Sequence, residues 1–244
     1  MNQIDSTVWQ DAAVSSKYLE GVRGALPLAS HQMDVLLRMA RAMDRPVGRV
    51  LDLGCGDGIL AATVLDAFPA AKAVLADFSE TMLDAARRRF AATPERVTVA
   101  AIDYGREDWR DALPAGRFDV VVSGYSIHHQ TDERKRRIYG EIFELLEPGG
   151  LFVNVEHVSS ATDWGRRLSE ENLVDAIYAY QQRRNSGKSR EEVAREYVYR
   201  EDKQANILAP VEDQCRWLRE IGFEDVDCYL KIFELAVFGG RRPA

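Results

Sequence analysis

"RVLDLGCGDGIL", residues 49–60, is an apolar run that leads directly into three closely spaced glycines. Apolar runs of this length are typical of strands buried on both faces of a parallel sheet. The overlapping segment 60–68, LAATVLDAF, is expected to form a helix. A strand, a glycine turn and a helix in this order predict an α/β fold that binds a ligand at the turn.

The alternation of strand and helix continues through the middle of the chain. Further strands are expected at residues 72–78, 96–103, 118–126 and 151–156. Ser79 is expected to cap the helix after the second strand, and another helix is expected from about Thr131 until Pro148 and the glycines after it stop it. This order predicts a parallel sheet with helices on both faces.

Three further regions surround this core. Residues 8–45 have the apolar spacing of helices, and residues 159–209 also look helical, with a polar turn at 183–190. The chain ends with an expected helix at 210–223 and a hairpin at 226–240. We therefore expect a Rossmann-like, doubly wound, mostly parallel seven-stranded sheet with a C-terminal antiparallel hairpin. The expected domains are an N-terminal helical cap (1–45), a cofactor-binding core (46–158 and 210–244) and a helical lid insertion over the carboxyl edge of the sheet (159–209).

Composition limits the classes of function. The 244 residues carry a formal net charge of −7, which disfavours broad nucleic-acid binding. No apolar run approaches membrane-spanning length, and the first ten residues do not resemble a secretion signal, so no membrane association is expected. Three cysteines without a CxxC spacing predict a reducing, cytoplasmic location. A homodimer and a monomer remain open alternatives.

The glycine turn indicates the type of ligand. Gly54, Gly56 and Gly58 depart from the dinucleotide fingerprint, which would require a glycine where Ile59 stands. No Lys-Ser/Thr pair follows, so the turn is not a P-loop. Asp52 at the end of the strand would repel a pyrophosphate and favours a ligand with a positively charged amino group.

The ends of the next two strands complete this binding pattern. Asp77 lies 19 residues after Gly58, where a carboxylate can accept hydrogen bonds from both ribose hydroxyls. Asp103 ends the third strand and can accept from an adenine amino group, and Phe78 and Ile102 can provide apolar walls.

Five stretches in order resemble the class I S-adenosylmethionine-dependent methyltransferases: LDLGCGDG, LADFSETML, AIDY, FDVVVSGYSIHH and LLEPGGLFVNVE. The resemblance covers roughly residues 49–157 and implies S-adenosyl-L-methionine as the cofactor. The implied cofactor-binding residues are Asp52, Gly54, Gly56, Gly58, Asp77 and Asp103. Phe78 and Ile102, as apolar walls, and Ser123, near the end of the fourth strand, are also expected to bind the cofactor.

The lid insertion and the C-terminal tail also look similar to the carboxy-S-adenosylmethionine synthases of tRNA wobble-uridine modification. That resemblance implies an arginine in the insertion that pairs with the extra carboxylate of the product, and Arg200 is nearest in position. The insertion also carries several aromatic residues, which as a group suggest a small, partly apolar or aromatic acceptor: Trp164, Tyr178, Tyr180, Tyr197 and Tyr199. Of these, Tyr197 is expected on the substrate side.

Histidines gather after the fourth and fifth strands. His128 and His129 follow the fourth strand, and Glu156 and His157 end the fifth, so all four face the expected ligand edge. Three interpretations stay open: packing beneath the lid, a general base, and a metal site. Adjacent side chains on an extended segment point apart, which disfavours the metal site.

We expect a cytoplasmic methyltransferase that acts on a small molecule, with His128 or His129 as the base and no metal. Glu156, His157, Tyr197 and Arg200 are the expected substrate-binding residues. The alternatives are an enzyme that uses the same cofactor for a different transfer, a metal-dependent enzyme on the same fold, and a cofactor-binding protein without turnover.

Overall fold

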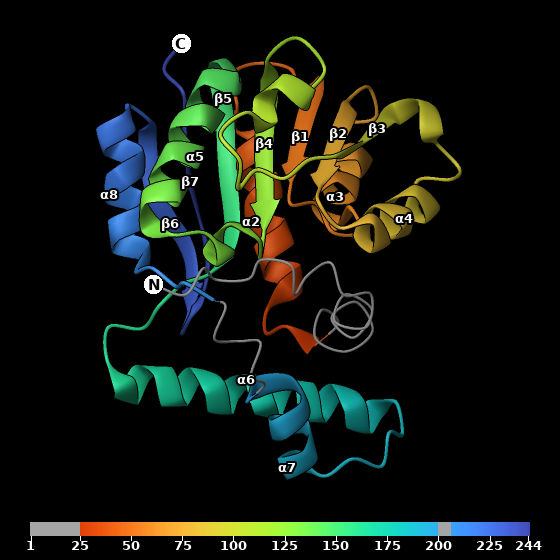
Figure 1. The fold of residues 1–244 in the computed structure, drawn as a ribbon, viewed down its shortest axis with the longest axis vertical. Coiled ribbons are helices and arrows are strands. Elements are labelled where there is room, and N and C mark those ends of the chain that lie inside the picture. Colours follow the sequence, from red (N-terminus) through yellow and green to blue (C-terminus); the bar gives the residue numbers. More distant parts are fainter. Residues whose placement is uncertain (1–24, 200–205) are drawn as a thin grey trace.

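A computed structural model describes residues 25–199 and 206–244. Its strands form one sheet in the order β3-β2-β1-β4-β5-β7-β6 (Figure 1). They are β1 (Arg49–Leu53), β2 (Lys72–Asp77), β3 (Val97–Ala101), β4 (Phe118–Gly124), β5 (Leu146–His157), β6 (Glu224–Ile232) and β7 (Leu235–Arg241). β1 to β5 are parallel, whereas β7 runs antiparallel to both β5 and β6. The expected doubly wound sheet with a C-terminal hairpin is confirmed.

Helices cover both faces of the sheet, as the alternation predicts. They are α2 (Ala29–Arg41), α3 (Ile59–Ala67), α4 (Glu80–Arg89), α5 (Asp132–Leu145) and α8 (Val211–Ile221). α5 and α8 pack on one face, and α2, α3 and α4 on the other. The period-two alternation of the strands explains this division, since Leu51 and Val121 join the first layer whereas Val50 and Val120 join the second.

Two helix starts test the capping predictions. α5 begins where the helix was expected, and the Thr131 hydroxyl caps it by accepting the backbone N–H of Arg134 at 3.2 Å. Ser79 occupies the equivalent place before α4, but its hydroxyl makes no capping bond. The capping prediction for its side chain is therefore wrong: the Ser79 hydroxyl is buried without a hydrogen-bond partner among the described residues, and its backbone N–H donates to the Asp77 carboxylate.

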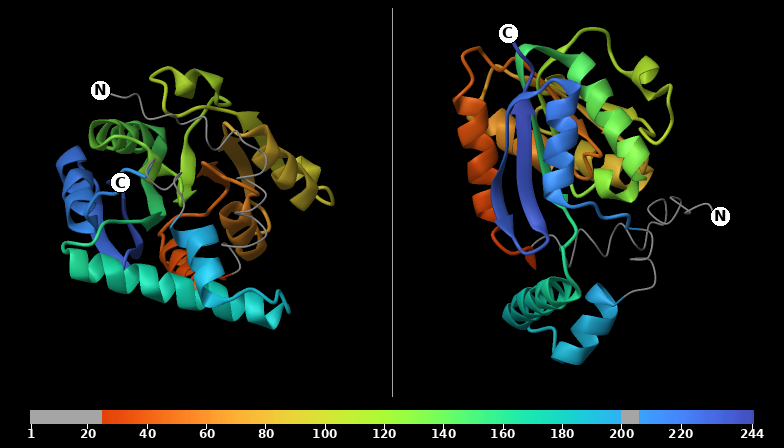
Figure 2. Two further views of the ribbon diagram at one scale, coloured as in Figure 1. Left: turned by 60° about the horizontal axis from the view of Figure 1, so that its bottom comes forward. Right: turned by 90° about the vertical axis from the view of Figure 1, so that its left-hand side faces the viewer.

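The lid insertion lies beyond the carboxyl ends of the strands (Figure 2). It consists of α6 (Asp163–Arg183), α7 (Arg190–Val193) and one turn of π-helix (Ala194–Val198), with the predicted polar turn between α6 and α7. Its buried side chains form a cluster separate from both sheet layers. Trp164, which shares the helical spacing of the lid, is 67% exposed and stays outside that cluster.

Part of the expected N-terminal helical region, residues 8–24, and the predicted Arg200 lie outside the described residues. Within the described residues, no helix combines the length and the apolar character needed to cross a bilayer.

Candidate active site

The glycine turn after β1 adopts a backbone that only glycine tolerates well. Gly54, Gly56 and Gly58 have φ values of 67°, 55° and 78°, all in the left-handed region. The N–H groups of Gly54 and Cys55 donate to the Ala76 carbonyl of β2 at 2.8 and 3.0 Å. The turn is therefore fixed to the neighbouring strand and open toward the carboxyl edge.

Replacing Gly54 by alanine is expected to destabilise this turn. A Cβ at Gly54 would lie 1.8 Å from the Ser126 hydroxyl oxygen, and the residue would keep a positive φ. Overpacking with backbone strain should lower the free energy of unfolding by about 1–3 kcal/mol. Urea unfolding measures the change, and Gly140→Ala is the control, since a Cβ there meets nothing within 4 Å. If Gly54→Ala and Gly140→Ala were equally stable, the close approach of Gly54 to Ser126 would be contradicted.

Asp52 lies at the end of β1 with its carboxylate buried. Its Oδ2 accepts the backbone N–H of Ala61, in the first turn of α3, at 2.9 Å. The carboxylate therefore sits between the glycine turn and the start of a helix, and it also lines the cavity described below. A buried carboxyl group here suits a ligand that carries an ammonium group.

Asp77 bonds to the glycine turn from the end of β2. Its two carboxylate oxygens accept the N–H groups of Gly56 and Ser79, each at 2.9 Å. Burial raises the pKa of Asp77, although these backbone donors oppose the shift. Each carboxylate oxygen has a second lone pair, so both can still accept from ligand hydroxyls.

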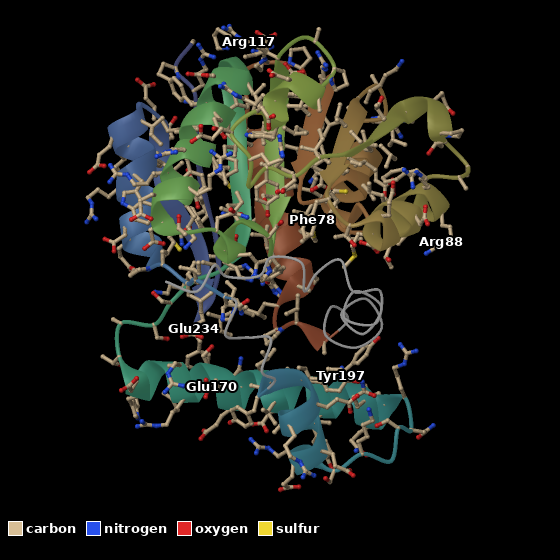
Figure 3. All side chains as sticks on the ribbon, in the orientation of Figure 1. Phe78, Arg88, Arg117, Glu170, Tyr197 and Glu234 are labelled. Carbon is tan, nitrogen blue, oxygen red and sulfur yellow. The ribbon has the colours of Figure 1, made fainter. Side chains whose placement is uncertain are left out.

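The other predicted cofactor residues lie along the same edge. Ile102 is buried after β3, and Asp103 is exposed, with its Oδ1 accepting the Gly105 N–H at 2.9 Å. Phe78 is half-buried at the lower end of β2 (Figure 3). Ser123 differs from these, because its hydroxyl donates to the Leu53 carbonyl at 2.7 Å within the sheet.

A cavity of about 510 Å³ opens beside the glycine turn. On one side Asp52, Gly54 and Gly56 line it, together with Cys55 and Asp57. The other walls come from α2, the ends of β4 and β5, and the lid. These lining residues include Leu26, Ala29, Ser30, Gln32, Met33, Gly124, Tyr125, Val155 and Tyr180.

His128 and Glu156 form a buried pair at the ends of β4 and β5. His128 Nδ1 lies 2.6 Å from Glu156 Oε1, and the His128 backbone N–H donates to Oε2 at 3.1 Å. Burial raises the pKa of Glu156 to about 7, although the His157 N–H and the His129 ring oppose the shift. The carboxylate thus orients the His128 ring, with Nε2 as the nitrogen that faces away from it.

The two other histidines of the cluster have different surroundings. The His129 ring lies 3.9 Å from that of His128, centroid to centroid, and burial with this neighbour lowers the pKa of His129 well below its usual value. His157 Nε2 lies 3.3 Å from Glu234 Oε2. Glu234 belongs to the turn between β6 and β7, near the lid (Figure 3). None of the three rings is among the residues that line the cavity.

The same polar cluster ties the ends of the lid insertion to the sheet. Ile207, in the returning segment, donates its N–H to the His128 carbonyl at 2.9 Å and accepts from the buried Lys135 ammonium. At the outgoing segment, the Ser160 N–H donates to Glu234 Oε1 at 3.0 Å. The lid therefore begins and ends at fixed points.

The remaining predicted residues are placed as follows. Tyr197 packs inside the lid cluster, with its hydroxyl accepting from Gln181 at 3.4 Å, and not against the sheet (Figure 3). Among residues 25–199 and 206–244, no group of three or more His, Cys, Asp or Glu side chains is arranged to hold a metal ion.

Gln32 and Tyr125 are among the cavity residues that the sequence did not predict, whereas Tyr180 belongs to the aromatic residues expected in the lid. Gln32 is 1% exposed and lies four residues before Leu36 on the buried face of α2, so a polar residue on an apolar face was the available signal. Tyr125 follows β4 directly, within the stretch whose histidines were singled out.

The sheet is doubly wound, with a left-handed glycine turn after β1 and the carboxylate of Asp77 at the end of β2. These features define a Rossmann-like domain that binds a nucleoside-type ligand at its carboxyl edge. Residues 50–150 match the family model described as a methyltransferase domain. This match supports the resemblance of the core to the class I S-adenosylmethionine-dependent methyltransferases, for which S-adenosyl-L-methionine is the cofactor.

Curated relatives that match the same part of the chain are named as methyltransferases. A demethylmenaquinone methyltransferase of Symbiobacterium thermophilum is 34% identical over 121 residues, 48% of this chain and 46% of the relative. A ubiquinone/menaquinone biosynthesis C-methyltransferase of Desulfotalea psychrophila is 31% identical over 115 residues, 47% of this chain and 44% of the relative. The chain spans about half the length of these curated relatives. In fold, it is similar to an O-methyltransferase family protein of Burkholderia thailandensis, with a TM-score of 0.65, 19% identity, and coverage of 98% of this chain and 61% of that one.

The residues present fit this cofactor. At Gly56, which lines the cavity, a Cβ would meet nothing nearer than Met82 Sδ at 3.9 Å, so the missing side chain leaves space for a ligand. The buried Ser79 hydroxyl, next to Asp77, has no hydrogen-bond partner among the described residues. A sulfonium cofactor with an ammonium group and two ribose hydroxyls matches these donors and acceptors.

Proposed function

We propose that this chain transfers the methyl group of S-adenosylmethionine to a small-molecule acceptor. The observation that carries the proposal is the cavity, because it joins the glycine turn and Asp52 to a space walled by α2, Tyr125 and the lid. One continuous space lets the methionine end of a cofactor and an acceptor meet. The relatives named as methyltransferases support the same reaction class.

In this mechanism the protein mainly positions the reactants. The bound cofactor supplies an activated methyl group, so holding nucleophile, methyl and sulfur in line contributes most of the rate gain. Asp52 and the glycine turn would hold the methionine end, Asp77 the ribose, and Ile102 with Asp103 the adenine. The lid would exclude water from the acceptor side.

The decisive experiment is calorimetry with S-adenosylhomocysteine, followed by transfer of a labelled methyl group to a panel of small molecules. We expect binding without added metal and turnover of at least one acceptor. Absence of binding would contradict the proposal. Formation of a modified cofactor without any acceptor would favour the carboxy-S-adenosylmethionine alternative, and binding without turnover across the panel would favour a cofactor-binding protein.

For the proton acceptor we propose His128. Its 2.6 Å contact with Glu156 is the arrangement in which a carboxylate orients an imidazole base. His129 suits this role less well, since its lowered pKa leaves it a weak base. Arg200, Tyr197 and His157 remain predicted substrate contacts.

A structural role for the same pair has its own support. The histidine rings do not line the cavity, whereas their sequence neighbours Tyr125 and Val155 do. In this alternative, His128 and Glu156 support the cavity wall and anchor Ile207 of the lid. The pH profile of the His128 variant described in the Discussion distinguishes the two roles.

We expect the lid helices to become protected when ligands bind. α6 and α7 have a separate core and meet the cavity through Tyr180, so closure would restrict their opening. Hydrogen exchange should slow in residues 163–198 on adding S-adenosylhomocysteine with an acceptor. Protection confined to residues 52–58, with no change in α6, would contradict a closing lid.

A further inference from the structure

The cavity has two ends with different chemistry. Asp52, Gly54 and Gly56 form the cofactor end, whereas Gln32, Met33, Tyr125, Val155 and Tyr180 form an end between α2 and the lid, here called the α2–lid end. The predicted ribose and adenine residues Asp77, Phe78, Ile102 and Asp103 are not among the lining residues. The cavity therefore adjoins the expected methionine site at Asp52 and not the expected nucleoside site.

We propose that the α2–lid end is the acceptor subsite, and that it takes a neutral acceptor with an aromatic or apolar body and a hydroxyl group read by the Tyr125–Gln32 pair. This inference rests on the proposed methyl transfer and names the substrate class of that site.

The distribution of charge supports a neutral acceptor. Among the described lining residues, the charged ones are Asp52, Asp57 and Arg89, and all three belong to the cofactor end. Arg89 forms an ion pair with Asp57 and also donates to the Asp57 carbonyl at 2.8 Å. At the α2–lid end the described walls are apolar, aromatic or uncharged polar. A charged acceptor group buried there would lose its hydration without gaining a counter-charge from these described walls.

Tyr125 is held in a fixed position at this end. Its φ of 51° lies in the left-handed region, which a bulky side chain rarely adopts. Its N–H donates to the Val155 carbonyl at 2.8 Å, which links β4 to β5 at the cavity wall. Strained residues persist where their surroundings impose the conformation, and they concentrate at ligand sites.

The Tyr125 hydroxyl reaches across to α2. It donates to Gln32 Oε1 at 2.9 Å, and the amide of the buried Gln32 lies 3.4 Å from the Pro27 carbonyl. A phenol and a carboxamide together offer donors and acceptors, so a ligand hydroxyl can join this pair. A pocket built around such a hydrogen bond rejects analogues that lack the hydroxyl far more strongly than an apolar pocket can.

Tyr180 supplies the part of the cavity wall that comes from the lid. Its half-buried ring lines the cavity, and its hydroxyl accepts from Arg184 Nη1 at 2.8 Å. Two tyrosines from the sheet edge and from the lid suit an aromatic acceptor body, because aromatic pairs add to the gain from area burial.

The test is calorimetry of 2-naphthol with the protein saturated in S-adenosylhomocysteine. The comparison ligands are 2-naphthoate, which carries a charge, and naphthalene, which lacks the hydroxyl. We expect 2-naphthol to bind at least tenfold more tightly than either. Tyr125→Phe should lower the affinity for 2-naphthol by about tenfold, so that 2-naphthol no longer binds more tightly than naphthalene. The affinity of this variant for S-adenosylhomocysteine should stay within about twofold of the wild-type value.

Two further variants complete the design. Gln32→Leu, which removes the polar partner at similar size, should reproduce the loss if Tyr125→Phe folds poorly. Tyr229→Phe is the matched control, since Tyr229 bonds to Asp225 on β6, away from the cavity. The proposed acceptor class would be overturned if 2-naphthoate bound as tightly as 2-naphthol. It would also be overturned if Tyr125→Phe and Gln32→Leu both kept the full wild-type affinity for 2-naphthol. If both variants also lose affinity for S-adenosylhomocysteine, the Tyr125–Gln32 pair binds the cofactor and not the acceptor. If the wild-type protein does not bind S-adenosylhomocysteine, the proposed function itself is refuted.

Discussion

Asp77→Ala is expected to weaken binding of S-adenosylhomocysteine by about 2–4 kcal/mol, or roughly 30- to 1000-fold. The carboxylate is the predicted partner of both ribose hydroxyls, and it also holds Gly56 and Ser79 through their N–H groups. Removing the carboxylate therefore has two effects: it takes away the ligand contacts, and it loosens the glycine turn. Titration calorimetry measures the affinity directly.

Two controls separate these contributions. Asp77→Asn keeps one acceptor oxygen for the turn and should lose less affinity than the alanine variant. Asp108→Ala removes a carboxylate that is paired with Arg106 on the surface and should bind as the wild type does. If Asp77→Ala keeps full affinity while remaining folded, the cofactor assignment at the end of β2 is wrong.

His128→Gln is expected to lower the rate of methyl transfer by roughly a hundredfold, with cofactor affinity nearly unchanged. Glutamine keeps a hydrogen bond to Glu156 within reach but cannot accept a proton near neutral pH. His129→Gln should be milder, because the His129 ring already has a strongly lowered pKa. Initial rates with an acceptor from the panel measure both effects.

The pH profile identifies the cause of the loss. A histidine base is active when neutral, so the wild-type rate should fall as pH drops through its pKa, by about one logarithmic unit per pH unit. His128→Gln should remove that slope, whereas His31→Gln, on the exposed side of α2, should retain it. If His128→Gln keeps the wild-type slope and loses only thermal stability, the pair supports the cavity wall instead.

The order of the secondary structure was predictable because each element carries its own local signal. Continuous apolar runs such as residues 49–53 mark strands covered on both faces, and the glycines after β1 mark a left-handed turn. Spacing along the chain also located Asp52 and Asp77 at the carboxyl edge, since parallel strands end on the same side of a sheet. Family resemblance then supplied the cofactor.

The partners of individual side chains were not predictable from spacing. Ser79 precedes a helix with the identity of a capping residue, yet the nearby Asp77 carboxylate binds its N–H and the hydroxyl does not cap. The pairing of His128 with Glu156, 28 residues apart, depends on β4 and β5 lying side by side. Sequence therefore located the histidines at the correct edge without distinguishing a base from a packing residue.

The sequence by itself determined the sheet, the glycine turn and the carboxyl edge at which the ligand is expected, because hydrophobic periodicity and glycine conformations are local properties. Only the tertiary structure decided which residues enclose the cavity. Gln32, Tyr125 and Tyr180 come from a helix before β1, the end of β4 and the lid, and they meet only when these three segments pack together. Contacts between distant segments depend on the register and tilt of whole elements, and no short stretch of sequence encodes them.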